Sequence, residues 1–317
     1  MAKKKKFKKR KKQIVNLSTS AIALLIIVVV GIILYFTGAF DGILNGSLGG
    51  NRVPTAVKGQ MQMHFLDVGQ GDCILLLSEG KSMLVDTGDK DDTYNKKIVD
   101  YLKEYGISTI NYLVLTHPDA DHIGGAPDVI NNFTVEKCIM PNYTKTTKIF
   151  EDTLDALDKN NVEVIDANAA VSNDNGFTVG EAKCEILAPL SDSYADVNDA
   201  SVVIYVSFGE KGILLTGDAE SESEEDMVSR YSSKILKADV LKSGHHGSTT
   251  SSGDEFLDLV APKYAVISCG EGNQYNHPHK ETLDRYEDRN IEIYRTDLHG
   301  TIIMITDGKN IEFLLEK

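Results

Sequence analysis

Short apolar segments that alternate with amphipathic helical segments constrain the fold of this chain more than any other feature. Apolar or alternating runs begin at Met61 and recur to the C-terminus, separated by turns rich in Gly, Asp and Asn. Between them lie segments with helical periodicity, such as residues 91–106, where Ile98, Val99 and Leu102 share one face and a glycine ends the run. Two such strand–helix halves predict an α/β body in which sheets pack face to face with helices outside.

The first sixty residues differ in composition from the rest of the chain. Nine of the first twelve residues are Lys or Arg, although the whole chain carries a net charge of −14. The uncharged apolar run at 21–36 and its uncharged flanks approach the roughly twenty residues that cross a bilayer as a helix. A cleaved signal peptide, the alternative, usually has a shorter apolar region and a small-residue cleavage site. We therefore expect a basic cytoplasmic arm at 1–17, a transmembrane anchor at 18–40, a linker at 41–60 and a folded domain at 61–317.

The basic arm predicts the topology of that anchor. Clusters of Lys and Arg stay on the cytoplasmic side of a membrane. We therefore expect a single-pass protein of the cell membrane with a cytoplasmic N-terminus and an extracytoplasmic domain. The membrane is the expected partner, and no feature of the sequence calls for an obligate protein partner. A nucleic-acid patch is the alternative interpretation of the basic arm.

The four cysteines show no Cys-x-x-Cys spacing. Cys73, Cys138, Cys184 and Cys269 are scattered, and we expect each to be a small buried residue on a strand. A disulfide remains open because an exterior location permits one.

Histidines and carboxylates gather where predicted strands end. Six of the eight histidines form three close pairs, His117/His122, His245/His246 and His277/His279, and Asp119 and Asp121 lie inside the first pair. Loops positioned by a rigid sheet often carry catalytic groups. For the other two, His64 and His299, we expect ordinary core or surface roles.

Three further polar positions also adjoin strands. Asp86 and Asp218 each follow an apolar run at a glycine, and Asn198–Asp199 precedes another such run. Each has a plain alternative, because an aspartate at such a place commonly makes a turn or caps a helix.

The ordered series of these motifs resembles the metallo-β-lactamase fold superfamily, and more narrowly the extracytoplasmic hydrolase domain of ComEC-type DNA-uptake proteins. The segments that carry the resemblance are HFLDVGQGDCILL, LVDTG, LTHPDADHIGG, NDASVVIYV, ILLTGDAE, LKSGHHGSTTSS and NHPHKETLDRY, spanning His64 to Tyr286. The resemblance implies an α/β fold of the metallo-β-lactamase αββα sandwich type, here with one N-terminal transmembrane helix. ComEC transporters carry a many-helix channel, whereas this sequence has one candidate anchor, so we expect the hydrolase without the channel.

The resemblance also implies a pair of metal sites. His117 and Asp119 would face the first metal, Asp121 and His122 the second, and Asp218 would bridge the two. The HHGS motif would supply another ligand of the second metal, for which we favour His245 and leave His246 open. Asp86 would orient one of the ligands, as metal sites require.

Two departures from the family pattern affect the first metal. Position 119 is Asp where the broad motif has His, which shifts the preference toward Mn²⁺ or strengthens Zn²⁺ binding electrostatically. The third histidine of the superfamily is missing, and Asn198 or Asp199 falls near its place. We expect two divalent ions, Zn²⁺ or Mn²⁺, and single occupancy stays open.

These features predict a membrane-anchored phosphodiesterase or nuclease that uses a metal-activated hydroxide. Asp121 would serve as a catalytic carboxylate as well as a ligand. His277 and His279 would grip a phosphate oxygen or protonate a leaving group, unless they merely form a polar turn. The substrate would be DNA or a phosphodiester of a cell-envelope polymer, and the acidic body favours the polymer mildly. The alternatives are hydrolysis of a lactone, β-lactam or other ester, and metal-stabilised binding without turnover.

Overall fold

A computed structural model describes residues 57–173 and 175–317 of the chain. The predicted basic arm, the predicted anchor at 18–40 and most of the predicted linker lie outside these residues. Within the described part, every helix is too short or too polar to span a bilayer.

The first of two sheets has eight strands in the order β15-β14-β1-β2-β3-β4-β5-β6. Neighbours from β15 to β3 pair antiparallel, and those from β3 to β6 pair parallel. Its strands are β1 (Met61–Phe65), β2 (Ile74–Ser78), β3 (Lys81–Val85), β4 (Thr109–Val114), β5 (Thr134–Met140), β6 (Glu163–Asp166), β14 (Ile302–Thr306) and β15 (Ile311–Leu315).

The second sheet has seven strands in the order β13-β12-β11-β10-β9-β8-β7. Strands β7 to β10 pair antiparallel, and β10 to β13 pair parallel. Its strands are β7 (Gly176–Val179), β8 (Ala182–Ala188), β9 (Val203–Phe208), β10 (Lys211–Leu215), β11 (Val240–Lys242), β12 (Tyr264–Ile267) and β13 (Glu292–Arg295).

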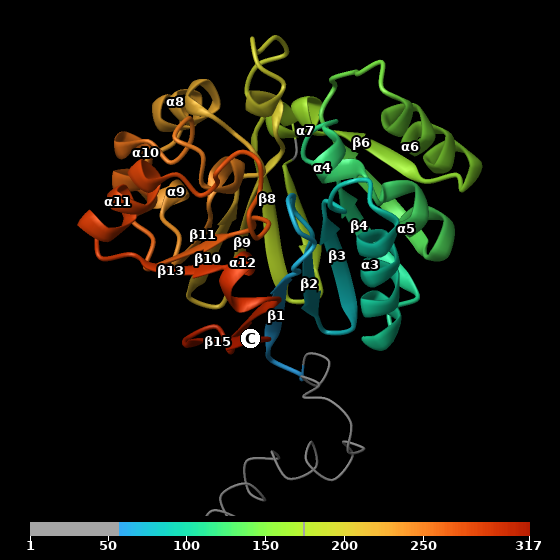
Figure 1. Cartoon of the computed structure of the whole chain (residues 1–317), viewed down its shortest axis with the longest axis horizontal. Coiled ribbons are helices and arrows are strands. Elements are labelled where there is room, and N and C mark those ends of the chain that lie inside the picture. The colour runs from blue at the N-terminus through green and yellow to red at the C-terminus, as the bar shows by residue number, and fades with distance from the viewer. Residues whose placement is uncertain (1–56, 174) are drawn as a thin grey trace, which may run out of the picture. The chain divides into compact units, whose positions relative to one another are not determined.

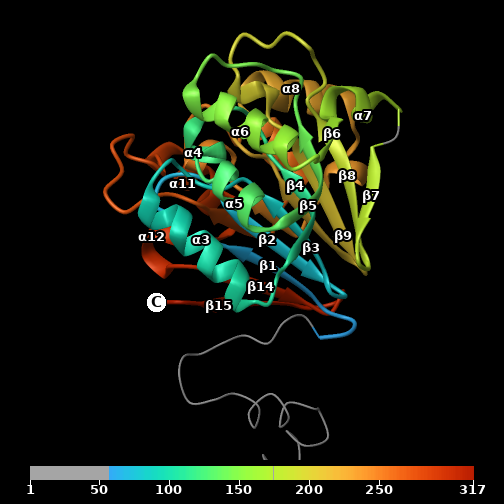
Figure 2. The same cartoon turned by 90° about the vertical axis from the view of Figure 1, so that its right-hand side faces the viewer.

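Helices cover the outer faces of both sheets (Figures 1 and 2). The first sheet carries α3 (Asp92–Glu104), α4 (Ala120–Ile123), α5 (Ala126–Asn132) and α6 (Lys148–Lys159), and apolar side chains of these helices pack against it. The second carries α8 (Ser221–Arg230), α9 (Ser233–Leu236), α10 (Asp254–Val260) and α11 (Lys280–Asp288). The remaining short helices are α7 (Ala167–Asn173), α12 (Thr296–His299), and the 3-10 turns η1 (Asn198–Ala200) and η2 (Gly244–Gly247).

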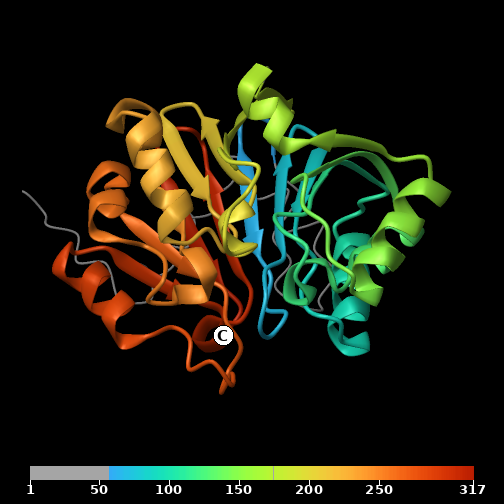
Figure 3. The same ribbon diagram turned by 90° about the horizontal axis from the view of Figure 1, so that it is seen from above.

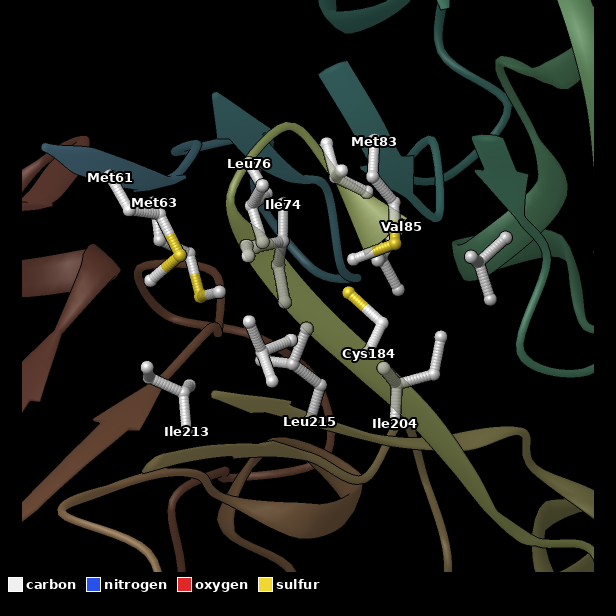
Figure 4. Packing of buried hydrophobic residues seen from close by; sticks show 14 of the residues in the cluster. Met61, Met63, Ile74, Leu76, Met83, Val85, Cys184, Ile204, Ile213 and Leu215 are labelled. Atoms are coloured by element: carbon white, nitrogen blue, oxygen red, sulfur yellow. The ribbon is translucent and has the colours of Figure 1, made fainter. Parts of the chain in front are cut away.

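The main core lies between the two sheets. Met63, Leu76 and Met83 of the first sheet face Ile204 and Leu215 of the second, and all are buried (Figure 4). Because side chains alternate across a strand, the intervening residues of the same strands face the helices instead. The central strands of each sheet are therefore buried on both faces, and the view from above shows two helical layers outside two sheets (Figure 3).

The long elements agree with the sequence analysis, and the differences concern short ones. Helix α3 begins after Asp91, whose carboxylate accepts the N–H groups of Thr93 and Tyr94. Strands β14 and β15 form a C-terminal hairpin, and the sequence Asp307-Gly308 between them is typical of a hairpin turn. Helices α7, α9 and α12 were not expected, because four to seven residues are too few to display a helical period.

The four cysteines are free and buried, as expected for small core residues. The expectation that each lies on a strand is wrong for two of them. Cys73 lies just before β2 and Cys269 just after β12.

Candidate metal centre

The histidine and carboxylate motifs lie at the carboxyl ends of four strands. Asp86 follows β3, His117 and His122 follow β4, Asp218 follows β10, and the His245–His246 pair follows β11. Strands β3 and β4 are parallel neighbours in one sheet, and β10 and β11 are parallel neighbours in the other. Parallel neighbours end at the same edge, so each sheet presents two of these loops together.

The two sheets bring these loops into contact. His122 Nε2 lies 3.2 Å and His246 Nε2 lies 3.3 Å from Asp218 Oδ2, and His246 Nε2 lies 3.5 Å from Asp121 Oδ2. One ligand atom of each of the four residues lies within 4.8 Å of the others. Groups from both halves of the chain thus surround one small volume.

Several buried atoms around this volume make no hydrogen bond. They are His117 Nε2, His122 Nε2, Asp218 Oδ1 and His246 Nε2, although the His122 and His246 atoms lie within ion-pair distance of Asp218 Oδ2. Leaving such atoms unpaired is costly, so each calls for an explanation such as an ion. Imidazole nitrogens and carboxylate oxygens are ligands of Zn²⁺ and other divalent metals, so these residues fit a divalent cation.

Asp86 holds His122 from behind. Its Oδ2 lies 2.8 Å from His122 Nδ1 and 2.7 Å from Thr116 Oγ1, and its Oδ1 accepts the Thr116 N–H at 2.8 Å. A carboxylate bound to one imidazole nitrogen fixes the ring and leaves the other nitrogen free for a metal. His246 is held similarly, since its Nδ1 donates to the Ser268 carbonyl at 2.9 Å. These contacts fit the orienting role that the resemblance implied for Asp86, which stays a prediction.

The charges of the group shift the pKa values of its members. Burial disfavours charged imidazoles, but nearby Asp218 and other carboxylates raise the pKa of His246 to about 9 and that of His122 well above its usual value. Burial would raise the pKa of Asp218, yet His122 and His246 hold it well below its usual range. Burial, with the neighbouring His122, lowers the pKa of His117 to about 4.

The two adjacent histidines of the HHGS motif have different surroundings. His246 belongs to the four-residue group and is buried. His245 is partly exposed, its Nδ1 lies 2.7 Å from Glu220 Oε1, and its Nε2 lies 3.8 Å from Asp218 Oδ2. The geometry therefore favours His246 over His245, the reverse of the preference drawn from the sequence. Both residues have left-handed backbone conformations, which no sequence motif specified.

Asn198 and Asp199, the candidates near the missing histidine, have different surroundings in the structure. Asn198 lines the cavity of the site and donates to Glu220 Oε1 at 3.2 Å. Asp199 Oδ1 instead accepts the N–H groups of Glu220 at 3.0 Å and Ser223 at 2.9 Å. It therefore caps the start of α8, the plain alternative for an aspartate at a turn.

The two histidines of the NHPH motif, His277 and His279, also have different surroundings. His277 lines the cavity and its buried Nδ1 is unpaired, and burial with nearby His245 and His246 lowers its pKa to about 4. His279 uses both ring nitrogens elsewhere: Nδ1 accepts the Thr249 N–H at 3.1 Å, and Nε2 lies 3.2 Å from the Tyr275 carbonyl oxygen. The structure thus brings His277, but not His279, to the cavity.

The cavity itself has a volume of about 180 Å³. It is lined by Gln70, His117, Asp119, Asp121, Asn198, Asp218, His245, His246, Tyr275 and His277. The sequence analysis did not single out Gln70, Tyr275 or Glu220, nor Lys145, whose ammonium contacts the Asp119 carboxylate. Gln70 and Glu220 lie within or beside segments that carry the resemblance, which is the signal that could have found them, whereas Lys145 lies in none.

Comparison with known proteins gives the same superfamily as the motifs. A family model described as the metallo-beta-lactamase superfamily matches residues 66–271. ComE operon protein 3 of Bacillus subtilis (strain 168) is 31% identical over 261 residues, covering 77% of this chain and 33% of that protein. Competence protein ComA of Neisseria gonorrhoeae is 31% identical over 239 residues, covering 74% of this chain and 31% of that protein. The chain therefore spans about a third of the length of these curated relatives.

A solved structure is similar at the level of the fold alone. CmlA, a diiron beta-hydroxylase from Streptomyces venezuelae, matches with a TM-score of 0.52 at 14% identity, covering 79% of this chain and 55% of that one.

Proposed function

This chain belongs to the metallo-beta-lactamase superfamily, and from that premise we propose that it is a membrane-anchored, metal-dependent hydrolase of phosphodiesters. Its similarity to competence proteins confirms the resemblance to ComEC-type proteins. The observation that carries the proposal is the convergence of Asp121, His122, Asp218 and His246, of which the last three have buried atoms without a hydrogen-bond partner.

Different residues of the chain would have different roles in such a reaction. Asp121, His122 and His246 would hold one cation, His117 and Asp119 would face a second, and Asp218 lies where it could contact both. Divalent cations there would supply an activated water nucleophile and stabilise the charge of the transition state. Asp86 keeps His122 in place by the bonds described above. His277, with an unpaired Nδ1 at the cavity, is placed to bind or protonate an oxygen of the substrate.

Two features support a phosphodiester substrate. One of the relatives is named a competence protein, and together with the resemblance to DNA-uptake proteins this favours DNA. Lys145, partly exposed beside Asp119, provides a cation within reach of a phosphate at the cavity. A phosphodiester of a cell-envelope polymer remains the other source of the same chemistry, and the substrate test separates the two.

Turnover by the full chain in detergent tests this proposal. The purified protein, supplied with Zn²⁺ or Mn²⁺, should hydrolyse bis-p-nitrophenyl phosphate or single-stranded DNA and leave nitrocefin intact. Asp218→Asn should reduce the rate at least about 100-fold, whereas Asp284→Asn, an exposed position on α11, should leave it unchanged. Hydrolysis of nitrocefin alone would replace the proposal with an ester or lactam hydrolase. Metal binding without any turnover would indicate a binding protein.

Sedimentation with membranes tests the predicted anchor. The full chain should sediment with membranes, and a variant lacking residues 1–40 should remain in the supernatant. A full chain that stays in the supernatant would contradict the anchor.

Elemental analysis of the purified protein should find Zn²⁺ or Mn²⁺, and two equivalents or one would distinguish a binuclear from a mononuclear centre.

A further inference from the structure

A fully buried ion pair joins the two sheets. Lys242 Nζ lies 2.8 Å from Asp72 Oδ2, and the side chains are 0% and 1% exposed. Lysine is among the residues least often buried, and taking an ion pair out of water costs several kcal/mol per ion before the pairing offsets it. A core of this size does not need such a pair, so its location calls for an explanation.

Lys242 occupies a position that otherwise faces the core between the sheets. It is the last residue of β11, in which Val240 packs between the sheets and Leu241 packs against the outer helices. Because side chains alternate along a strand, Lys242 shares the inward side with Val240. Asp72 comes from the opposite sheet, in the loop between β1 and β2. The pair therefore links the two halves that supply the candidate metal ligands.

The pair lies directly behind these ligands. Asp72 Oδ1 is 3.6 Å from His246 Nδ1, and the Asp72 N–H donates to the carbonyl of Asp121 at 3.3 Å. Carboxylate oxygens of Asp72 and Asp86 also lie within 4.8 Å of a His122 nitrogen. Asp72 thus contacts one ligand from each half of the chain, with its backbone on Asp121 and its carboxylate on His246.

Two details distinguish this pair from an ordinary structural one. Asp72 Oδ1 is buried and has no hydrogen-bond partner, although it faces the His246 ring. The Lys242 ammonium also donates to the carbonyl of Ser243 at 2.8 Å, next to the turn that carries the two histidines. Of the buried carboxylates here, Asp72, Asp86 and Asp218, only Asp72 pairs with a lysine or arginine among the described residues.

We propose that Lys242 and Asp72 act as a positioning pair that aligns the His246 imidazole and the Asp121 main chain for metal binding. The Asp72 carboxylate lies 3.6 Å from His246 Nδ1, close enough to attract the ring electrostatically while its N–H bonds the Ser268 carbonyl, and Lys242 holds that carboxylate in place. Partners of this kind determine the orientation of a ligand, and their loss typically weakens metal affinity about 10- to 100-fold. The inference rests on the proposed metal-dependent function.

Measurements of metal affinity and of thermal stability together test the positioning role of this pair. Dissociation constants for Zn²⁺ and Mn²⁺ are obtained by chelator competition on the full chain, and the melting temperature is taken on the metal-free protein. Lys242→Met should weaken binding about 10- to 100-fold and lower the melting temperature. Asp72→Asn, which keeps the shape but loses the charge, should weaken binding in the same direction.

Two control variants separate positioning from mere stability. Leu241→Ala, the neighbouring buried residue on the other face of β11, should lower the melting temperature and leave the dissociation constants unchanged. Lys211→Met removes a lysine from the ion pair with Asp239 and should also leave metal binding unchanged.

The outcomes are distinct. If Lys242→Met loses stability as Leu241→Ala does but binds metal as tightly as the wild type, the pair is only structural and the inference is overturned. If Lys242→Met does not fold, the double variant Lys242→Met/Asp72→Asn, which leaves no unpaired charge, decides in its place: weak binding supports the inference and tight binding overturns it. A wild-type chain that binds neither metal would contradict the proposed function instead.

Discussion

Adjacent residues with the same side chain can have different roles, as His245 and His246 do. His246 is buried among Asp121, His122 and Asp218, whereas His245 is partly exposed and bound to Glu220. From the HHGS motif we favoured His245, whereas the geometry favours His246. Their backbone conformations direct one ring into the group and the other toward its rim.

We predict that the two histidines differ in their effect on metal binding. His246→Ala removes a ligand and should weaken metal affinity at least about 100-fold, because the remaining groups cannot complete the coordination. His245→Ala should weaken it about tenfold or less, a supporting effect. Calorimetric titration with Zn²⁺ on the full chain measures both. Equal losses would place His245 among the ligands as well.

His64 has the ordinary core role expected for it. Its ring is buried, Nδ1 lies 2.7 Å from the Tyr101 hydroxyl, and Nε2 lies 3.1 Å from Gln62 Oε1. Burial lowers the pKa of His64 to about 3, so the folded chain resists protonation of this ring. Unfolding exposes the ring and restores its usual pKa.

This histidine should make the protein sensitive to acid. Above pH 6.5, the usual histidine pKa, His64 is neutral in both the folded and the unfolded chain and does not lower the free energy of unfolding. As the pH falls from 6.5 toward 3, only the unfolded chain binds the proton, and the free energy of unfolding decreases by up to roughly 5 kcal/mol. Urea unfolding between pH 7 and pH 4 should show this loss, and His64→Gln should reduce it. His299→Gln, on a partly exposed ring, should not. An unchanged pH dependence in His64→Gln would assign acid sensitivity to other groups.

Among the elements, the turn between β1 and β2 contacts the metal centre most closely. Gly71 has a φ of +119°, and a Cβ there would lie 2.1 Å from the carbonyl oxygen of Asp121. This glycine allows the turn to pack directly on the backbone of a candidate ligand. The turn also carries Gln70 and Asp72 to the site.

Gly71→Ala should therefore affect both stability and metal binding. The clash with a main-chain atom cannot be relieved by a side-chain rotation, so Asp121 must shift, and we expect a loss of about 2–4 kcal/mol. Gly80→Ala is the matched control, since it has a φ of +73° and open space around its Cβ. It should cost only the backbone strain of about 1–2 kcal/mol and leave metal affinity unchanged. Denaturant unfolding and Zn²⁺ titration of both variants measure the difference.

For the described body as a whole, we predict a fold that does not depend on a metal. Three apolar clusters, one between the sheets and one under each helical layer, are formed without any of the candidate ligands. The metal centre sits at one junction of the two sheets and adds to a core that is already complete.

Metal removal should therefore lower stability without unfolding the protein. A ligand present at 100 times its dissociation constant stabilises by about 2.7 kcal/mol, which corresponds to about 5–10 °C in melting temperature for a chain of this size. Chelation should lower the melting temperature of the wild type by this amount, and added Zn²⁺ or Mn²⁺ should restore it. Asp218→Asn should show little of this shift. Loss of the circular dichroism signal on chelation would instead indicate a fold that requires metal.

The elements that can be predicted from the sequence are those with a local pattern of residues. Helix α3 has a capping aspartate, an apolar face and a terminal glycine in one continuous segment, so neighbouring residues suffice to predict it. The same applies to the C-terminal hairpin with its Asp-Gly turn. The short helices α7 and α12 carry no such pattern, because contacts with the sheets rather than local propensity hold them.

The amino-acid sequence alone determined the chemistry of the site, because the types and order of its histidines and aspartates are written in short motifs. It also determined the two-sheet class of the fold through the alternation of strands and helices. Only the tertiary structure decided that His246 rather than His245 joins the central group, that Asp199 caps a helix, and that Lys242 meets Asp72. These outcomes depend on backbone conformation and on contacts between segments far apart in the chain, and no local pattern of residues encodes them.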